Sequence, residues 1–309
     1  MESKIMTMKE AVSKFVNSGD LLFLSGMQHG EPSAAVHEIV RQKIDHLTLV
    51  CCLGFVNRSL PVGEGLVDKM IIGHMQLDDK TNYYVAKAKS MNKLPVLEEY
   101  SHFGIALALM AGQMGVPFLP TRCQIGSDMP TYNSNIRTID CPFTGEKLGI
   151  VRAVVPDVGI IHVQRADAEG NAQKWGTLGV DQEGVNASRK VIVTTEKIVA
   201  PEVIRRDPNR TIVPGFRVDA VVEQPFGAYP SHLAGCYNDG PMVFGTMMGG
   251  KEAYDENLNE TVYGVKDWNE YLENLKKKNG PDFLDKIRLK NPAMSDPVPS
   301  GYETIGGNE

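Results

Sequence analysis

The feature that most constrains this chain is a short apolar run that passes directly into a polar turn. Residues 158–163 read Val-Gly-Ile-Ile-His-Val, and residues 166–171 read Ala-Asp-Ala-Glu-Gly-Asn. A largely apolar run of this length is typical of a central strand. The Asp, Gly and Asn of the second segment supply the turn that ends it. The pair by itself predicts an α/β domain.

Similar strand signals alternate with helix signals along the chain. Thr7 and Glu10 have the spacing of a capping box, which predicts a helix that stops at Ser18-Gly19. Pro32 has the place of a first-turn proline in the next helix, and Gly115 ends a predicted helix over 105–114. We expect a three-layer α/β fold, with a mostly parallel sheet and helices on both faces. The remaining predicted strands cover 21–24, 47–51, 69–72, 153–155, 191–194 and 220–223.

The chain becomes more polar after Gly249. Helical spacing returns at 266–278, where Trp268, Tyr271, Leu272 and Leu275 form an apolar stripe. Beyond Pro292 we expect a frayed tail. The sequence therefore predicts an α/β domain over 1–250, followed by a C-terminal helical extension and tail over 251–309.

Composition excludes several classes of function. The net charge is −6, and Lys276-Lys277-Lys278 is the longest basic run, so nucleic acid and anionic membranes are not expected partners. No segment has the roughly 18 apolar residues of a membrane span. The cysteines are odd in number and lack the spacing of a zinc or redox motif, which predicts free buried thiols, no metal site and a cytoplasmic location. They are Cys51, Cys52, Cys123, Cys141 and Cys236.

Four segments in a fixed order resemble the family I coenzyme A transferases, specifically the α-type subunit of glutaconate CoA-transferase. They are residues 157–171, Ile-Val-Pro-Gly at 212–215, Val-Asp-Ala-Val-Val at 218–222 and Pro-Phe-Gly-Ala-Tyr-Pro-Ser at 225–231. The resemblance implies the CoA-transferase fold and exchange of CoA between an acyl-CoA and a carboxylic acid. Coenzyme A enters as a thioester substrate, and no other cofactor is implied.

The loop after the first predicted strand is a candidate substrate site. It contains Gly26, Gln28, His29 and Gly30, and it leads into a helix N-terminus, where α/β sheets receive ligands. A tight turn without a ligand is the alternative. Gln76 belongs to the same predicted substrate-binding set.

His102 has the position at which the resemblance implies a glutamine that contacts the substrate. Histidine keeps a hydrogen-bond donor and adds a group that titrates near neutral pH, so His102 is a candidate acid or base as well as a binding residue. A helix-capping or surface histidine is the alternative. Gly126 and Ser127 match a Gly-Ser pair that lines the acyl site, whereas Cys123 is expected to be a buried thiol rather than a nucleophile.

The resemblance implies a catalytic glutamate that this chain lacks. Neither Glu64-Gly65 nor Glu169-Gly170 matches the Glu-x-Gly setting of the nucleophile. We therefore expect a β-type partner subunit to supply it, in a heterotetramer or heterooctamer, and the lone chain to be inactive. Residues 225–231 with Tyr237 are a candidate contact surface, with plain sheet-end connections as the alternative.

Two substitutions argue against a dicarboxylic acyl group. The resemblance implies His where Tyr229 stands and Arg-Lys where Gly30-Glu31 stands. The acyl group and the acceptor acid stay open. Two other functions also stay open: an acyl-CoA hydrolase or decarboxylase that uses His102 as acid or base, and a CoA-binding protein without catalysis.

Overall fold

A sheet of seven parallel strands forms the centre of the fold. The structure is a computed structural model that describes residues 3–54, 56–240 and 250–289. The strand order is β14-β11-β8-β1-β2-β3-β4, with parallel pairing throughout. The strands are β1 (Leu21–Leu24), β2 (Leu47–Gly54), β3 (Val67–Met75), β4 (Val96–Glu99), β8 (Val158–Val163), β11 (Lys190–Thr195) and β14 (Ala220–Glu223).

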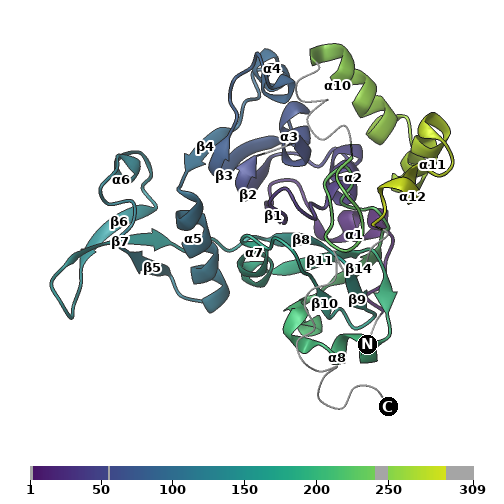
Figure 1. Cartoon of the computed structure of the whole chain (residues 1–309). Helices are drawn as coiled ribbons and strands as arrows, with labels where there is room; N and C mark the ends of the chain where they lie inside the picture. The colour runs from purple at the N-terminus through teal and green to yellow at the C-terminus, as the bar shows by residue number, and fades with distance from the viewer. Residues whose placement is uncertain (1–2, 55, 241–249, 290–309) are drawn as a thin grey trace.

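The two faces of this sheet carry separate hydrophobic cores. On β1, Leu22 and Leu24 belong to one core and Phe23 to the other, because successive side chains of a strand point to opposite faces. Helices pack on both faces (Figure 1), which confirms the predicted three-layer fold. The first face is covered by α1 (Met8–Phe15), α2 (Ser33–Arg41), α3 (Val56–Gly63) and α4 (Tyr83–Ser90), and the second by α5 (His102–Met114) and α7 (Asp181–Ala187).

Local signals fix the ends of these helices. Thr7 and Glu10 form the predicted capping box at the start of α1. Helix α5 begins three residues before the predicted start, because the Ser101 Oγ accepts a hydrogen bond from the Gly104 backbone N–H at 2.9 Å. It ends at Gly115, whose φ of +69° is left-handed, as expected.

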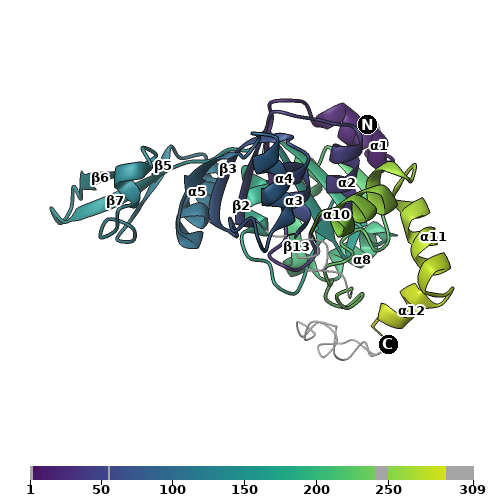
Figure 2. The same ribbon diagram turned by 90° about the horizontal axis from the view of Figure 1, so that it is seen from above.

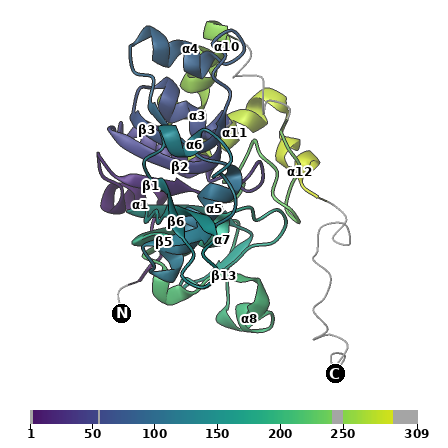
Figure 3. The same ribbon diagram turned by 90° about the vertical axis from the view of Figure 1, so that its left-hand side faces the viewer.

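An antiparallel arm extends from the main sheet between α5 and β8. Its strands are β5 (Phe118–Thr121), β6 (Ile136–Asp140) and β7 (Lys147–Arg152), and the short helix α6 (Met129–Tyr132) lies beside them. Figures 1 and 2 show this arm reaching outward, and Figure 3 views the molecule with the arm in front. The strand predicted at 153–155 is wrong: β7 ends at Arg152, and the next residues are the connection to β8.

The polar turn after β8 forms a hairpin in a second small sheet. The Asp167 carboxylate accepts hydrogen bonds from the backbone N–H groups of Glu169 and Asn171, and Gly170 has a φ of +98°. The predicted turn is therefore confirmed. This region contains β9 (Arg165–Asp167), β10 (Ala172–Gln173), β12 (Ile198–Val199), β13 (Thr211–Val213), α8 (Pro201–Arg205), η1 (Pro208–Arg210) and η2 (Gly215–Arg217).

The C-terminal helices pack against the first face of the fold. Helix α11 begins at Trp268 behind the capping residue Asp267, and its predicted stripe is buried at Trp268, Tyr271 and Leu272. The tail predicted after Pro292 lies outside the described residues. Among the described residues, no helix is both long and apolar enough to cross a bilayer. The helices are α10 (Gly250–Leu258), the π-helical η3 (Asn259–Tyr263), α11 (Trp268–Asn279) and α12 (Phe283–Ile287).

Candidate functional site at the carboxyl edge of the sheet

The loop after β1 is held in place by a buried ion pair. The Lys174 Nζ lies 2.6 Å from the Asp181 carboxylate and 3.3 Å from the Gly30 carbonyl oxygen. The other Asp181 oxygen accepts a hydrogen bond from the Gly26 backbone N–H at 2.6 Å. Because the pair is almost fully buried, the backbone of the loop is fixed relative to α7.

His29 is a buried part of the same loop. Its Nδ1 lies 2.9 Å from the Thr177 carbonyl oxygen, and its Nε2 accepts from the Ala234 backbone N–H at 3.0 Å. Burial, reinforced by the charge of Lys174, lowers the pKa of His29 to about 3. The ring is therefore neutral at pH 7, with both nitrogens engaged. Of the four predicted loop residues, Gln28 is the exposed one.

His102 is exposed at the first position of α5. Its ring lies against Gly73 of β3, where an added Cβ would be 2.3 Å from the His102 Cδ2. The glycine therefore allows the histidine to approach the sheet closely. Gln76 lies just beyond β3, half-buried, and its amide donates to the Thr81 Oγ1 at 2.7 Å.

Gly126 and Ser127 lie on the exposed loop between β5 and α6. The Ser127 Oγ donates to the Gln124 carbonyl oxygen at 2.7 Å. The Gln124 amide rests on Gly104 of α5, and its oxygen and nitrogen are buried without a hydrogen-bond partner in the described structure. This loop thus lies against the first turn of α5. Cys123 is exposed at its start, so the prediction of a buried thiol is wrong for this residue.

The structure therefore brings His102 together with the loop that carries Gly126 and Ser127, but it separates them from the loop that follows β1. Strand β2 lies between β1 and β3. Adjacent strands are about 4.8 Å apart, which places β3 roughly 10 Å from β1. The predicted residues line two neighbouring parts of one sheet edge rather than a single cluster.

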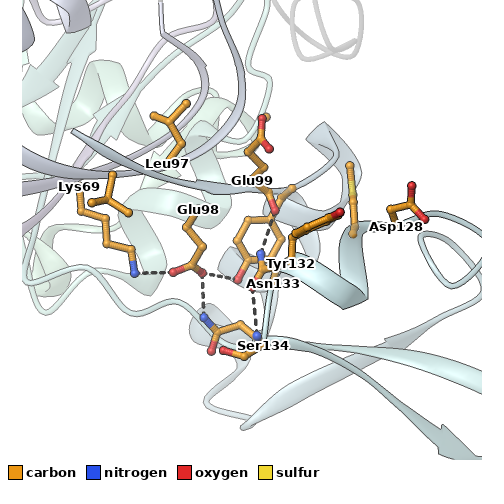
Figure 4. A pocket seen from close by; sticks show the side chains of 13 residues that line it. Lys69, Leu97, Glu98, Glu99, Asp128, Tyr132, Asn133 and Ser134 are labelled. Atoms are coloured by element: carbon orange, nitrogen blue, oxygen red, sulfur yellow. Dashed lines mark hydrogen bonds and ion pairs between the residues drawn. The ribbon is translucent and has the colours of Figure 1, made fainter. Parts of the chain in front are cut away.

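A cavity of about 460 Å³ lies between β4 and the arm, and the sequence reasoning missed it (Figure 4). Glu98 occupies one wall. It pairs with Lys69 and accepts hydrogen bonds from the Tyr100 hydroxyl at 2.7 Å and the Asn135 amide at 2.8 Å. Burial raises the pKa of Glu98, but these three donors outweigh it and leave the pKa lowered. Glu98 is therefore a charged carboxylate. The only local signal for it was a pair of glutamates at a strand end.

The predicted contact surface at 225–231 is wrong, because its apolar side chains are buried within this chain. Phe226, Tyr229 and Tyr237 are at most 3% exposed. The Tyr229 ring centroid lies 6.4 Å from that of Tyr271 on α11. The alternative interpretation of this segment, a sheet-end connection, describes it correctly.

A second buried network, also missed, underlies that segment. The His162 Nε2 lies 2.9 Å from the Glu196 carboxylate, which also accepts from the Tyr237 hydroxyl at 3.0 Å. His162 is fully buried. The network therefore joins β8 to the segments that carry Glu196 and Tyr237, and it does not face a ligand. Among the described residues, no group of three or more His, Cys, Asp or Glu side chains could hold a metal ion.

A parallel sheet with helices on both faces and a candidate site at its carboxyl edge is the architecture of an α/β protein. The family model described as Coenzyme A transferase matches residues 5–224. The chain belongs to this family. It is 35% identical to the A-type subunit of the 3-oxoadipate CoA-transferase of Pseudomonas knackmussii, covering 87% of this chain and 97% of that protein. It is also 35% identical to the A-type subunit of the glutaconate CoA-transferase of Acidaminococcus fermentans, covering 88% of this chain and 92% of that protein.

The fold comparison agrees with the sequence comparison. The crystal structure of the glutaconate coenzyme A-transferase of Acidaminococcus fermentans superimposes with a TM-score of 0.84 at 32% identity. The match covers 96% of this chain and 98% of that chain. The predicted relationship to the α-type subunit, which is the A-type subunit of these relatives, is confirmed.

Proposed function

We propose that this chain is the α-type subunit of a two-subunit CoA-transferase that exchanges CoA between an acyl-CoA and a carboxylic acid. The observation that carries the proposal is a match over nearly the whole length of two relatives that are both A-type subunits. A partner subunit of the β type is therefore part of the proposal. Whether the assembly is a heterotetramer or a heterooctamer stays a prediction.

The positions of the two Glu-Gly pairs support a nucleophile from the partner. Glu64 precedes β3 and so lies at the amino end of that strand, away from the candidate site. Its carboxylate is bound by Lys87, Tyr254 and Tyr263. Glu169 lies in the exposed turn of the β9–β10 hairpin, outside the main sheet. Neither carboxylate is placed to attack a thioester at the carboxyl edge.

The proposed exchange balances as a series of acyl substitutions. A glutamate carboxylate of the partner attacks the acyl-CoA carbonyl and releases the CoA thiolate, which forms an acyl-glutamyl anhydride. The thiolate then attacks the glutamyl carbonyl and releases the first acid, leaving a glutamyl-CoA thioester. The same two steps in reverse order load the second acid.

This chain contributes groups that bind and orient the acyl part. His102 offers a ring N–H toward the thioester oxygen at the first turn of α5. Ser127 lies on the neighbouring loop, where its hydroxyl donates to the Gln124 carbonyl oxygen. Gln28 is the accessible side chain of the loop after β1. We place the enzyme in the cytoplasm, in agreement with five cysteines that are all free in the structure.

The test is co-expression of this chain with a β-type subunit, followed by incubation with an acyl-CoA and a free acid. Labelled CoA should move between the two, and intact-protein mass spectrometry should find the CoA adduct on the partner polypeptide. The isolated chain should do neither. Turnover or adduct formation by the isolated chain contradicts the proposal.

One observation favours a second candidate function. His102 is an exposed, titratable side chain at the candidate site, and a general base there suits an acyl-CoA hydrolase or decarboxylase. Such an enzyme would consume the thioester without forming a new one. The variants His102→Gln and His102→Ala separate the two functions.

A further inference from the structure

The cavity beside β4 adjoins the candidate catalytic region. Gly73 forms part of its lining, and the same glycine contacts the His102 ring. Its volume of about 460 Å³ is within the range of small-molecule sites. A thioester held near His102 would therefore have this cavity available for its acyl tail.

Negative charge dominates the lining of this cavity. One lysine, Lys69, faces three carboxylates, those of Glu98, Glu99 and Asp128, which leaves a net charge of −2. Lys69 is already paired with Glu98. Within the described residues, neither Glu99 nor Asp128 has a cation at ion-pair distance, and both are exposed. Figure 4 shows these two carboxylates apart from the Lys69–Glu98 pair.

A neighbouring cation, Arg152, contacts the lining residue Asn135. The Arg152 Nη1 lies 3.4 Å from the Asn135 amide oxygen and does not line the cavity. The remaining walls offer apolar surface from Val96, Leu97 and Met129. The lining thus suits an uncharged tail and repels an anionic one, because a carboxylate within a few ångströms of Glu99 or Asp128 would lack a compensating cation.

We propose that the cavity bounded by β3, β4 and α6 selects the acyl group, and that it takes monocarboxylic acyl groups with uncharged tails and rejects those ending in a second carboxylate. This inference rests on the proposed function, and it names the substrate class of that site. Glu99 and Asp128 are the specificity-determining residues in this proposal.

The experiment measures binding and exchange separately on the assembled two-subunit complex. Isothermal titration compares pentanoyl-CoA with glutaryl-CoA, which have the same chain length and differ by a terminal carboxylate. We expect pentanoyl-CoA to bind at least about tenfold more tightly at low salt. The difference should shrink at about 0.5 M salt, because exposed charges are screened.

Two charge-removing variants locate the effect. Glu99→Gln and Asp128→Asn should each strengthen glutaryl-CoA binding severalfold and leave pentanoyl-CoA binding within about twofold. Asp140→Asn is the matched control. It removes the same charge from exposed β6 of the arm, outside the cavity lining, and should change neither affinity.

The outcomes distinguish this inference from the proposed function. Equal or tighter binding of glutaryl-CoA, or variants that behave like Asp140→Asn, overturns the inference even if CoA exchange is observed. Loss of complex assembly in the two variants also overturns it, because the cavity would then be a contact between subunits. Selective binding of pentanoyl-CoA without CoA exchange supports the inference and contradicts the transferase function.

Discussion

Exposure separates the histidines that can meet a substrate from those that hold the fold. His29 and His102 were both predicted to bind substrate. His29 is 1% exposed with both ring nitrogens bonded, whereas His102 is exposed beside the cavity. A direct contact between the His29 ring and a substrate would require the loop after β1 to open. At the scale of single residues, His102 is the accessible candidate.

His102→Gln should leave CoA exchange within about threefold of the wild type. Glutamine preserves a hydrogen-bond donor at this position, so the hydrogen bond to the substrate is kept. Exchange of labelled CoA by the assembled complex measures the effect. His102→Ala removes the donor, and the loss of one uncharged hydrogen bond costs about 1 kcal/mol, so the rate should fall about fivefold.

A different result would favour the hydrolase or decarboxylase function. A general base contributes roughly 100-fold or more to a rate. A loss of that size in His102→Gln, together with loss of the pH dependence of the rate, would identify His102 as acid or base. That result would contradict the binding role that the transferase proposal gives to His102.

At the scale of elements, a buried histidine on α2 packs against the first residue of α11. The His37 ring lies 4.9 Å from the Trp268 ring, edge to face. Next to it, the Arg41 Nε donates to the Val262 carbonyl oxygen at 3.0 Å, which ties η3 to the same helix. The sequence showed the apolar stripe of α11 but not the surface on which it packs.

Acid should weaken this packing. Burial, helped by the charge of Arg41, lowers the pKa of His37 to about 3, against 6.5 in an unfolded chain. Between these values the unfolded chain binds a proton that the folded chain does not. The contribution of neutral His37 to the free energy of unfolding is therefore fully present above pH 6.5. It falls as the pH drops toward 3, by about 1.4 kcal/mol per pH unit. His29 acts in the same direction.

Urea unfolding from about pH 7 to about pH 4.5 measures this dependence. His37→Phe keeps an aromatic ring against Trp268 but cannot be protonated, so stability should depend less steeply on pH by about 1 kcal/mol per unit. His46→Gln is the control, because hydrogen bonding to Asp68 raises the pKa of exposed His46 instead of lowering it. An unchanged pH dependence in His37→Phe would contradict the assignment.

At the scale of the whole molecule, the C-terminal helices share a core with the N-terminal half. Met8 of α1, Tyr254 of α10 and Leu284 of α12 belong to one continuous hydrophobic cluster. The Tyr254 hydroxyl also donates to Glu64, at the end of α3, at 2.6 Å. The boundary predicted near residue 250 therefore does not coincide with a break in packing. The division into domain and extension stays a prediction.

We expect the chain to unfold in a single transition. Trp268→Ala should lower the midpoint of that transition through the loss of a buried ring, at a cost of about 3–5 kcal/mol, and should not create a second transition. Differential scanning calorimetry measures both properties. Exposed Phe143→Ala on the arm is the control and should leave the midpoint nearly unchanged. Two separate transitions would show that the helices unfold independently.

Local signals in the sequence determined part of the secondary structure and, by resemblance, the family. The apolar run at 158–163, the capping box at Thr7 and the stop at Gly115 depend on neighbouring residues, and each occurs in the structure as predicted. The strand predicted at 153–155 failed, because the antiparallel pairing of β5 with β7 ends at Arg152. That limit is set by residues about 30 positions away.

Only the tertiary structure decided which polar residues meet one another. The buried pair of Lys174 and Asp181, the His162–Glu196–Tyr237 network and the cavity wall formed by Glu98, Tyr100 and Asn135 join residues from separate elements. Burial decides whether such a residue supports the fold or faces a ligand. Burial depends on how the sheet, the arm and the C-terminal helices pack, and no local pattern in the chain records that packing.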